Sequence, residues 1–82
     1  RKRKLSGKIS SSIPGKIVSL NIKLGDFVKQ GQVVMVLEAM KMQNEIQAPL
    51  AGEIIEINCE SGDSIEANMP LIVIQPENVD DN

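Results

Sequence analysis

The two halves of this chain repeat each other at an offset of 37 residues, the spacing between Gly25 and Gly62. The alignment runs without a gap from Ile13 and Leu50 to Glu38 and Gln75. The matched identities include Gly15 with Gly52, Ile17 with Ile54, Asn21 with Asn58, Gly25-Asp26 with Gly62-Asp63 and Val36 with Val73. An internal repeat of this kind predicts two structurally equivalent halves related by a pseudo-two-fold axis.

Apolar residues alternate with polar ones at matching places in both halves. The alternating apolar residues are Val18, Leu20 and Ile22 in the first half and Ile55, Ile57 and Cys59 in the second. A period of two predicts half-buried strands, so these six side chains are expected to point inward. The runs 33–37 and 71–74 are continuously apolar and predict buried strands. A further short strand is expected near residues 8–10.

Turn residues separate these strands at short intervals, as at Pro14-Gly15, Gly25-Asp26 and Gly62-Asp63. An aspartate that follows glycine in a turn can accept backbone N–H bonds, which is the role expected of Asp26 and Asp63. No segment shows a helical period over ten or more residues. Many short strands with turns between them predict an all-β sandwich or barrel.

Composition limits what can stabilise such a domain. The chain has 82 residues, one cysteine, no histidine and one aromatic residue, Phe27. It is therefore one small domain without an intrachain disulfide, and the usual zinc sites cannot be built. The core must consist of aliphatic side chains, and Cys59 is expected to be a small buried member of it.

Charge divides the chain into three parts. Residues 1–11 are basic and are expected to be a flexible linker, and residues 76–82 form an acidic tail. Residues 9–75 carry four lysines and eight carboxylates, a net charge of −4. The basic leader lacks aromatic residues on which bases could stack, so no nucleic-acid partner is expected. No apolar run is long enough to span a bilayer, and with a single cysteine a cytoplasmic location is expected.

Glu38-Ala39-Met40-Lys41-Met42 lies at the junction of the two repeats. A lysine between two equal halves is expected to be displayed at a turn. This motif, followed by Ile46-Gln47-Ala48-Pro49 and Gly52, resembles the biotinyl domain, the biotin carboxyl carrier module of biotin-dependent carboxylases and decarboxylases. The resemblance covers residues 12–75 and leaves no room for the thumb insertion that one branch of that family carries.

The resemblance implies a flattened antiparallel β-barrel or sandwich of two four-stranded sheets, with biotin attached covalently to Lys41 in a hairpin turn. The chain would have no catalytic residue of its own. Its implied partners are a biotin protein ligase and the biotin carboxylase and carboxyltransferase domains or subunits. Direct insertion into a membrane is not expected.

The residues around Lys41 have two possible roles each. Met40 and Met42 either fill gaps in the core or form a recognition surface for the ligase and the catalytic subunits, although neighbours of a tip residue cannot both be deeply buried. Glu38 is either a surface charge at a strand end or a recognition residue. Ala39 is small and is expected to leave the approach to Lys41 open.

Two other functions remain open from the sequence. A lipoyl carrier domain shares the expected fold, the repeat and the central lysine, but lipoyl domains tend to have Asp before and Ala after the lysine. This chain has Met40 and Met42 at those positions. The other possibility is a β-domain that binds a partner while Lys41 is never modified.

Overall fold

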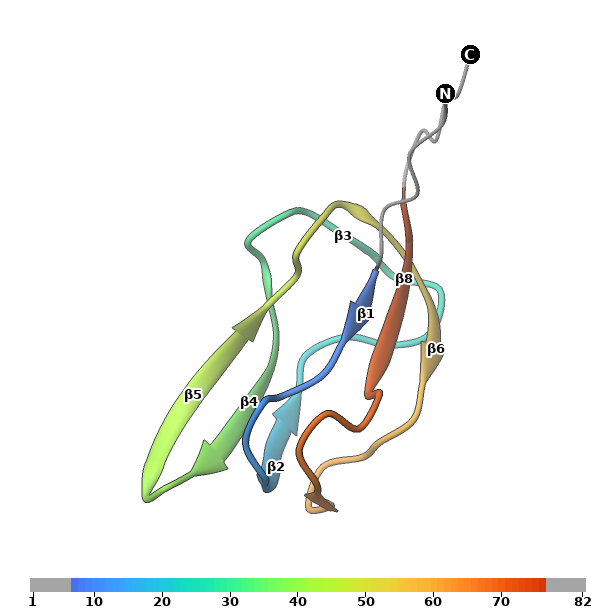
Figure 1. Cartoon of the computed structure of the whole chain (residues 1–82). Helices are drawn as coiled ribbons and strands as arrows, with labels where there is room; N and C mark the ends of the chain where they lie inside the picture. The colour runs from blue at the N-terminus through green and yellow to red at the C-terminus, as the bar shows by residue number, and fades with distance from the viewer. Residues whose placement is uncertain (1–6, 77–82) are drawn as a thin grey trace.

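The computed structural model describes residues 7–76, which form eight β-strands. The strands are β1 (Lys8–Ile9), β2 (Gly15–Leu20), β3 (Phe27–Val28), β4 (Val33–Ala39), β5 (Met42–Gln47), β6 (Gly52–Ile57), β7 (Ser64–Ile65) and β8 (Ile72–Pro76). They build two four-stranded antiparallel sheets with the orders β1-β8-β6-β3 and β5-β4-β2-β7 (Figure 1). The expected all-β architecture of two four-stranded sheets is confirmed. The described residues include no helix long and apolar enough to cross a membrane.

The two sheets are equivalent under the repeat. At an offset of 37 residues, β2, β3 and β4 correspond to β6, β7 and β8, and β1 corresponds to β5. Matching hydrogen bonds hold matching turns: Asp26 Oδ2 accepts from the Lys23 N–H at 2.8 Å, and Asp63 Oδ2 accepts from the Glu60 N–H at 2.9 Å. The turn role expected of both aspartates is therefore confirmed.

The core lies between the sheets and is aliphatic. Its almost completely buried side chains are Ile17, Val34, Met35, Leu37, Ile54, Leu71, Ile72 and Ile74. Cys59 is buried as expected, and so is Ile22, its counterpart in the first half. Leu20 and Ile57 are partly buried and pack against this cluster, so both point inward as expected.

A β-bulge in each half corrects part of the expected pattern. In β2 the register passes from Ile17 opposite Leu37 to Ser19 opposite Val36, which leaves Val18 without a partner residue. The same shift in β6 isolates Ile55. An extra residue in a strand breaks the alternation of side chains at that point. Val18 and Ile55 are therefore exposed, by 41% and 46%, and the expectation that they point inward is wrong.

Strand β1 lies where a short strand was expected near residues 8–10, inside the segment that was otherwise expected to be linker. Lys8 and Ile9 pair with Val73 and Ile72 of β8, and Ile9 is buried. The folded part of the chain therefore includes residues before the expected boundary at residue 12. Residues 1–6 of the expected linker and 77–82 of the expected acidic tail lie outside the described residues, and Pro76 closes β8.

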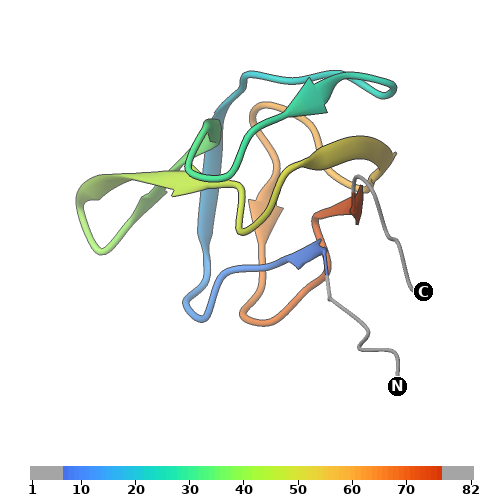
Figure 2. The same ribbon diagram turned by 90° about the horizontal axis from the view of Figure 1, so that it is seen from above.

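The hairpin of β4 and β5 is where the two halves differ most. These strands have 7 and 6 residues, whereas their counterparts β8 and β1 have 5 and 2. The hairpin consequently projects beyond the rest of the domain (Figure 2). The described part of the chain begins and ends at the opposite end of the molecule (Figure 1).

Candidate functional site

A two-residue turn joins β4 to β5. Ala39 pairs with Met42 across the strands, so only Met40 and Lys41 form the loop. Their φ angles are 54° and 65°, both in the left-handed region. Positive φ at both central residues defines a type I′ turn, whose twist matches that of the flanking strands and which usually contains Asn-Gly. Here the turn holds two residues with long side chains.

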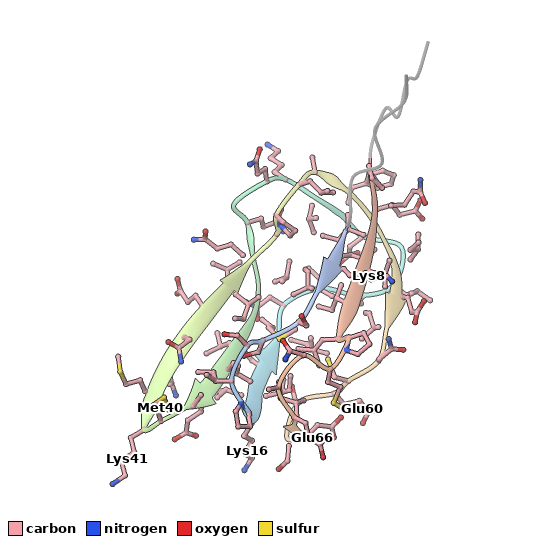
Figure 3. All side chains as sticks on the ribbon, viewed as in Figure 1. Lys8, Lys16, Met40, Lys41, Glu60 and Glu66 are labelled. Carbon is pink, nitrogen blue, oxygen red and sulfur yellow. The ribbon has the colours of Figure 1, made fainter. Side chains whose placement is uncertain are left out.

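Lys41 stands at the outermost point of this turn. It is exposed, and its side chain extends away from both sheets (Figure 3). Met40 and Met42 on either side are exposed by 78% and 64%. Neither methionine fills a gap in the core, so the packing role considered for them is excluded. The geometry agrees with the sequence prediction that Lys41 is displayed and that its two neighbours are not both deeply buried.

Ala39 and Gly15 lie next to each other directly beneath the turn. Ala39 is only 5% exposed. A Cβ atom at Gly15 would lie 2.5 Å from the Glu38 carbonyl oxygen and 3.1 Å from Ala39 Cβ. Real Cβ atoms do not approach a backbone oxygen that closely, so β2 can support the hairpin only with glycine at this position. The small size of Ala39 therefore allows β2 to pack closely against β4 at this point.

Asn44 is a contributor to the hairpin that sequence reasoning missed. It lies opposite Leu37 in the ladder, and its side-chain amide donates to the backbone oxygens of Leu37 and Met42, each at 3.4 Å. The bond to Leu37 joins β5 to β4 below the turn, and the bond to Met42 lies within β5. The signal available in the sequence was an amide side chain two positions after the motif, and the structure shows that it is half-buried.

Glu38 lies on the outer face of the hairpin, one rung below the Ala39–Met42 pair. It is exposed and lies between Lys16 of β2 and Gln43 of β5. These three residues line a shallow surface depression of about 320 Å³, together with Ile17, Val18 and Gly62. The structure therefore places Glu38, Ala39, Met40, Lys41 and Met42 together, four of them on the surface and Ala39 beneath it.

The chemistry that the hairpin turn offers is that of an accessible primary amine, the Lys41 side chain. Within residues 7–76 no cluster of three or more His, Cys, Asp or Glu side chains could hold a metal ion. A lysine amine can act as a nucleophile toward an activated carboxyl group once it has lost a proton. The site suits a residue that another enzyme modifies.

Comparison with known proteins gives a consistent result. Residues 5–74 match the model of the family described as "Biotin-requiring enzyme". The gamma subunit of glutaconyl-CoA decarboxylase from Acidaminococcus fermentans is 58% identical over 36 residues, which are 44% of this chain and 25% of that protein. The mitochondrial propionyl-CoA carboxylase alpha chain of Caenorhabditis elegans is 52% identical over 40 residues, which are 49% of this chain and 6% of that one.

Solved structures show the same fold. Urea carboxylase from Kluyveromyces lactis superposes with a TM-score of 0.78 and 27% identity, covering 92% of this chain and 7% of that enzyme. A single-chain, multi-domain long-chain acyl-CoA carboxylase gives a TM-score of 0.81 over 95% of this chain and 8% of that one. At 23% identity the second likeness concerns the fold alone. This chain thus corresponds to a small part of each of these large proteins.

Proposed function

Since the chain belongs to the family of biotin-requiring enzymes and is a carrier domain of the biotinyl type, we propose that Lys41 carries covalent biotin. In this role the domain moves a carboxyl group between a biotin carboxylase site and a carboxyltransferase site. One observation supports this most strongly. Lys41 projects from the tip of the longest hairpin, at the end opposite to the two ends of the described chain (Figures 1 and 3). A tether can therefore hold one end while the other end enters a partner's active site.

Attachment would form an amide at Lys41. A lysine amine in water is mostly protonated near neutral pH, so the ligase must accept a proton before Nζ attacks the activated biotin carboxyl carbon. The amide bond forms as the activating group leaves. Bound biotin supplies the ureido nitrogen that is carboxylated. The contribution of this chain is to hold Nζ clear of both sheets.

We assign recognition by the ligase to the residues beside the acceptor lysine. Met40 and Met42 present thioether side chains on both sides of Lys41, and Glu38 adds a carboxylate on the outer face. Ala39 and Gly15 pack together beneath the turn and fix its position. A ligase that binds this surface would contact the two flexible thioether side chains and the Glu38 carboxylate.

Carriage of the carboxyl group depends on tethering. A flexible link turns delivery into an intramolecular step, typically at an effective concentration in the millimolar range. The proposed partners are therefore the biotin carboxylase and carboxyltransferase of the same enzyme. We also propose that the protein works in the cytoplasm, where the unpaired Cys59 would remain reduced.

Carboxyl transfer gives a direct test of this proposal. The biotinylated chain is incubated with a biotin carboxylase, ATP and radiolabelled bicarbonate, and label on the chain is measured. The chain with Lys41→Arg, treated identically, is the control. Label on the wild-type chain alone supports the proposal. A biotinylated chain that gains no label from any biotin carboxylase tested would contradict a carboxyl-carrying role while leaving biotin attachment intact.

A further inference from the structure

The four methionines of the chain differ sharply in exposure. Met40 and Met42 are exposed by 78% and 64%, Met69 by 37%, and Met35 is completely buried. The two most exposed methionines are the two that flank Lys41. Neither of their side chains packs into the core, so neither is needed to hold the fold together.

A thioether in such a position is open to oxidation. Hydrogen peroxide transfers one oxygen atom to the methionine Sδ: the O–O bond breaks, an S–O bond forms, and the second oxygen leaves as water. Sulfur loses two electrons and the peroxide gains them. The product is a polar sulfoxide in place of a flexible apolar group, and methionine sulfoxide reductases can reverse the change.

We propose that Met40 and Met42 form a peroxide-sensitive modification site that controls whether Lys41 can accept its cofactor. This inference rests on the proposed function, because it concerns the enzyme that modifies Lys41. A ligase that encloses Lys41 must cover both neighbours. Burying a sulfoxide where a thioether fitted leaves a strong hydrogen-bond acceptor without a partner. Oxidation is therefore expected to lower the rate of biotin attachment about tenfold or more.

The order of oxidation is the first measurement. The chain is treated with limiting hydrogen peroxide, and sulfoxide at each methionine is followed by peptide mass spectrometry. Met40 and Met42 should oxidise first, Met69 more slowly and Met35 last. If Met35 or Met69 oxidises ahead of both, the inference is overturned at this step.

Biotin attachment by a biotin protein ligase is then compared before and after oxidation. The test variant combines Met40→Leu with Met42→Leu, and the matched control is Met69→Leu. The control should lose acceptance after peroxide, as the wild type does, and the test variant should not. Equal rates for oxidised and reduced wild type would refute the inference, and so would a loss that persists in the test variant.

Reductase treatment covers the case in which the leucine variant is itself a poor acceptor. Oxidised wild-type chain is incubated with methionine sulfoxide reductases A and B, and both the sulfoxide content and the rate of attachment are measured. If the rate of biotin attachment recovers as the sulfoxides of Met40 and Met42 are reduced, the inference is supported. If both methionines are repaired and the rate stays low, the inference is contradicted. Failure of the untreated chain to accept biotin would instead refute the proposed function.

Discussion

Met40 and Lys41 adopt the backbone conformation that glycine adopts at least cost. The left-handed region costs an L-residue roughly 1–2 kcal/mol, and this turn contains two such residues in succession. Elsewhere in the described residues, positive φ angles occur at Gly25, Gly31 and Gly62 and at one non-glycine residue, Asn68. The turn thus keeps the Lys41 amine at a position where glycine would make the folded domain more stable.

Replacing the turn residues should therefore exchange function for stability. The double change Met40→Asn with Lys41→Gly gives the sequence that a type I′ turn favours. We expect a gain of about 1 kcal/mol, which raises the melting temperature by roughly 4–8 °C in a domain of this size, with loss of biotin acceptance. Thermal melts of both proteins measure it. A lower melting temperature in the variant would contradict the assigned turn strain.

Cys59 is the buried titratable residue of the core. Its burial, and then the nearby Asp63 carboxylate, raise the pKa of the thiol above its ordinary value. The folded state therefore holds the thiol proton more tightly than the unfolded chain does. Stability from this source is fully present below the ordinary thiol pKa of about 8.5 and is lost as pH rises through the raised value.

A comparison with Cys59→Val isolates this effect. Urea unfolding at pH 7 and at about pH 10 gives the change in unfolding free energy for each protein. The wild type should lose more stability on going to alkaline pH than the variant does, because only the wild type carries the thiol. Equal losses in the two proteins would show that Cys59 ionisation is not coupled to folding.

The bulges in β2 and β6 decide which side chains stabilise the sandwich. Ile17 and Ile54 are completely buried at equivalent positions, whereas the next residues, Val18 and Ile55, face solvent. A bulge turns the strand so that its twist increases, which suits strands that wrap around a thin core. Both halves use the same device at the same place.

Substitutions at these two pairs should differ in their effect on the free energy of unfolding, because one pair is buried and the other is exposed. Ile17→Ala and Ile54→Ala should each cost about 2–5 kcal/mol, enough to unfold a small domain. Val18→Ser and Ile55→Ser should change stability by only about half a kcal/mol. Denaturant unfolding of the four variants tests the assigned register. If the Val18 and Ile55 changes were the costly pair, the bulges would be misplaced.

Alternation and the repeat predicted most of the elements, but not the bulges. Leu20, Ile22, Ile57 and Cys59 point inward as the period of two indicates, because they lie beyond the irregularity. Val18 and Ile55 fit the same pattern and are exposed. A bulge is set by pairing with the neighbouring strand, and no local pattern in β2 or β6 marks it. The display of Lys41 was predictable from its place between the repeats, whereas the contact between Gly15 and Ala39 depends on tertiary packing.

The pseudo-two-fold symmetry of the whole molecule shows which residues the fold does not require. Leu24 and Phe27 are exposed by 65% and 69%, and the equivalent positions in the second half are Ser61 and Ser64. The same backbone thus forms with serine at both places. The buried neighbour of Phe27 behaves differently, since Val28 corresponds to Ile65 and both are buried.

Transplanting the second-half residues tests this equivalence. Leu24→Ser with Phe27→Ser should change the free energy of unfolding by no more than about 1 kcal/mol in total. Val28→Ser, which places the same residue type at the buried position next to Phe27, should cost several times as much. Denaturant melts of these two variants and the wild type give the comparison. A loss as large for the exposed pair as for Val28 would mean that the two halves are not equivalent.

The most direct test of the account is the mass of the chain after incubation with biotin, ATP and a biotin protein ligase. We predict that one biotinyl group is added and that peptide mapping places it on Lys41. The variant Lys41→Ala should stay unmodified while keeping the melting temperature of the wild type, because Lys41 has no packing role. A parallel incubation with lipoate and a lipoate ligase should add nothing. Biotin on another lysine, no biotin at all, or lipoate on Lys41 would contradict the central claim.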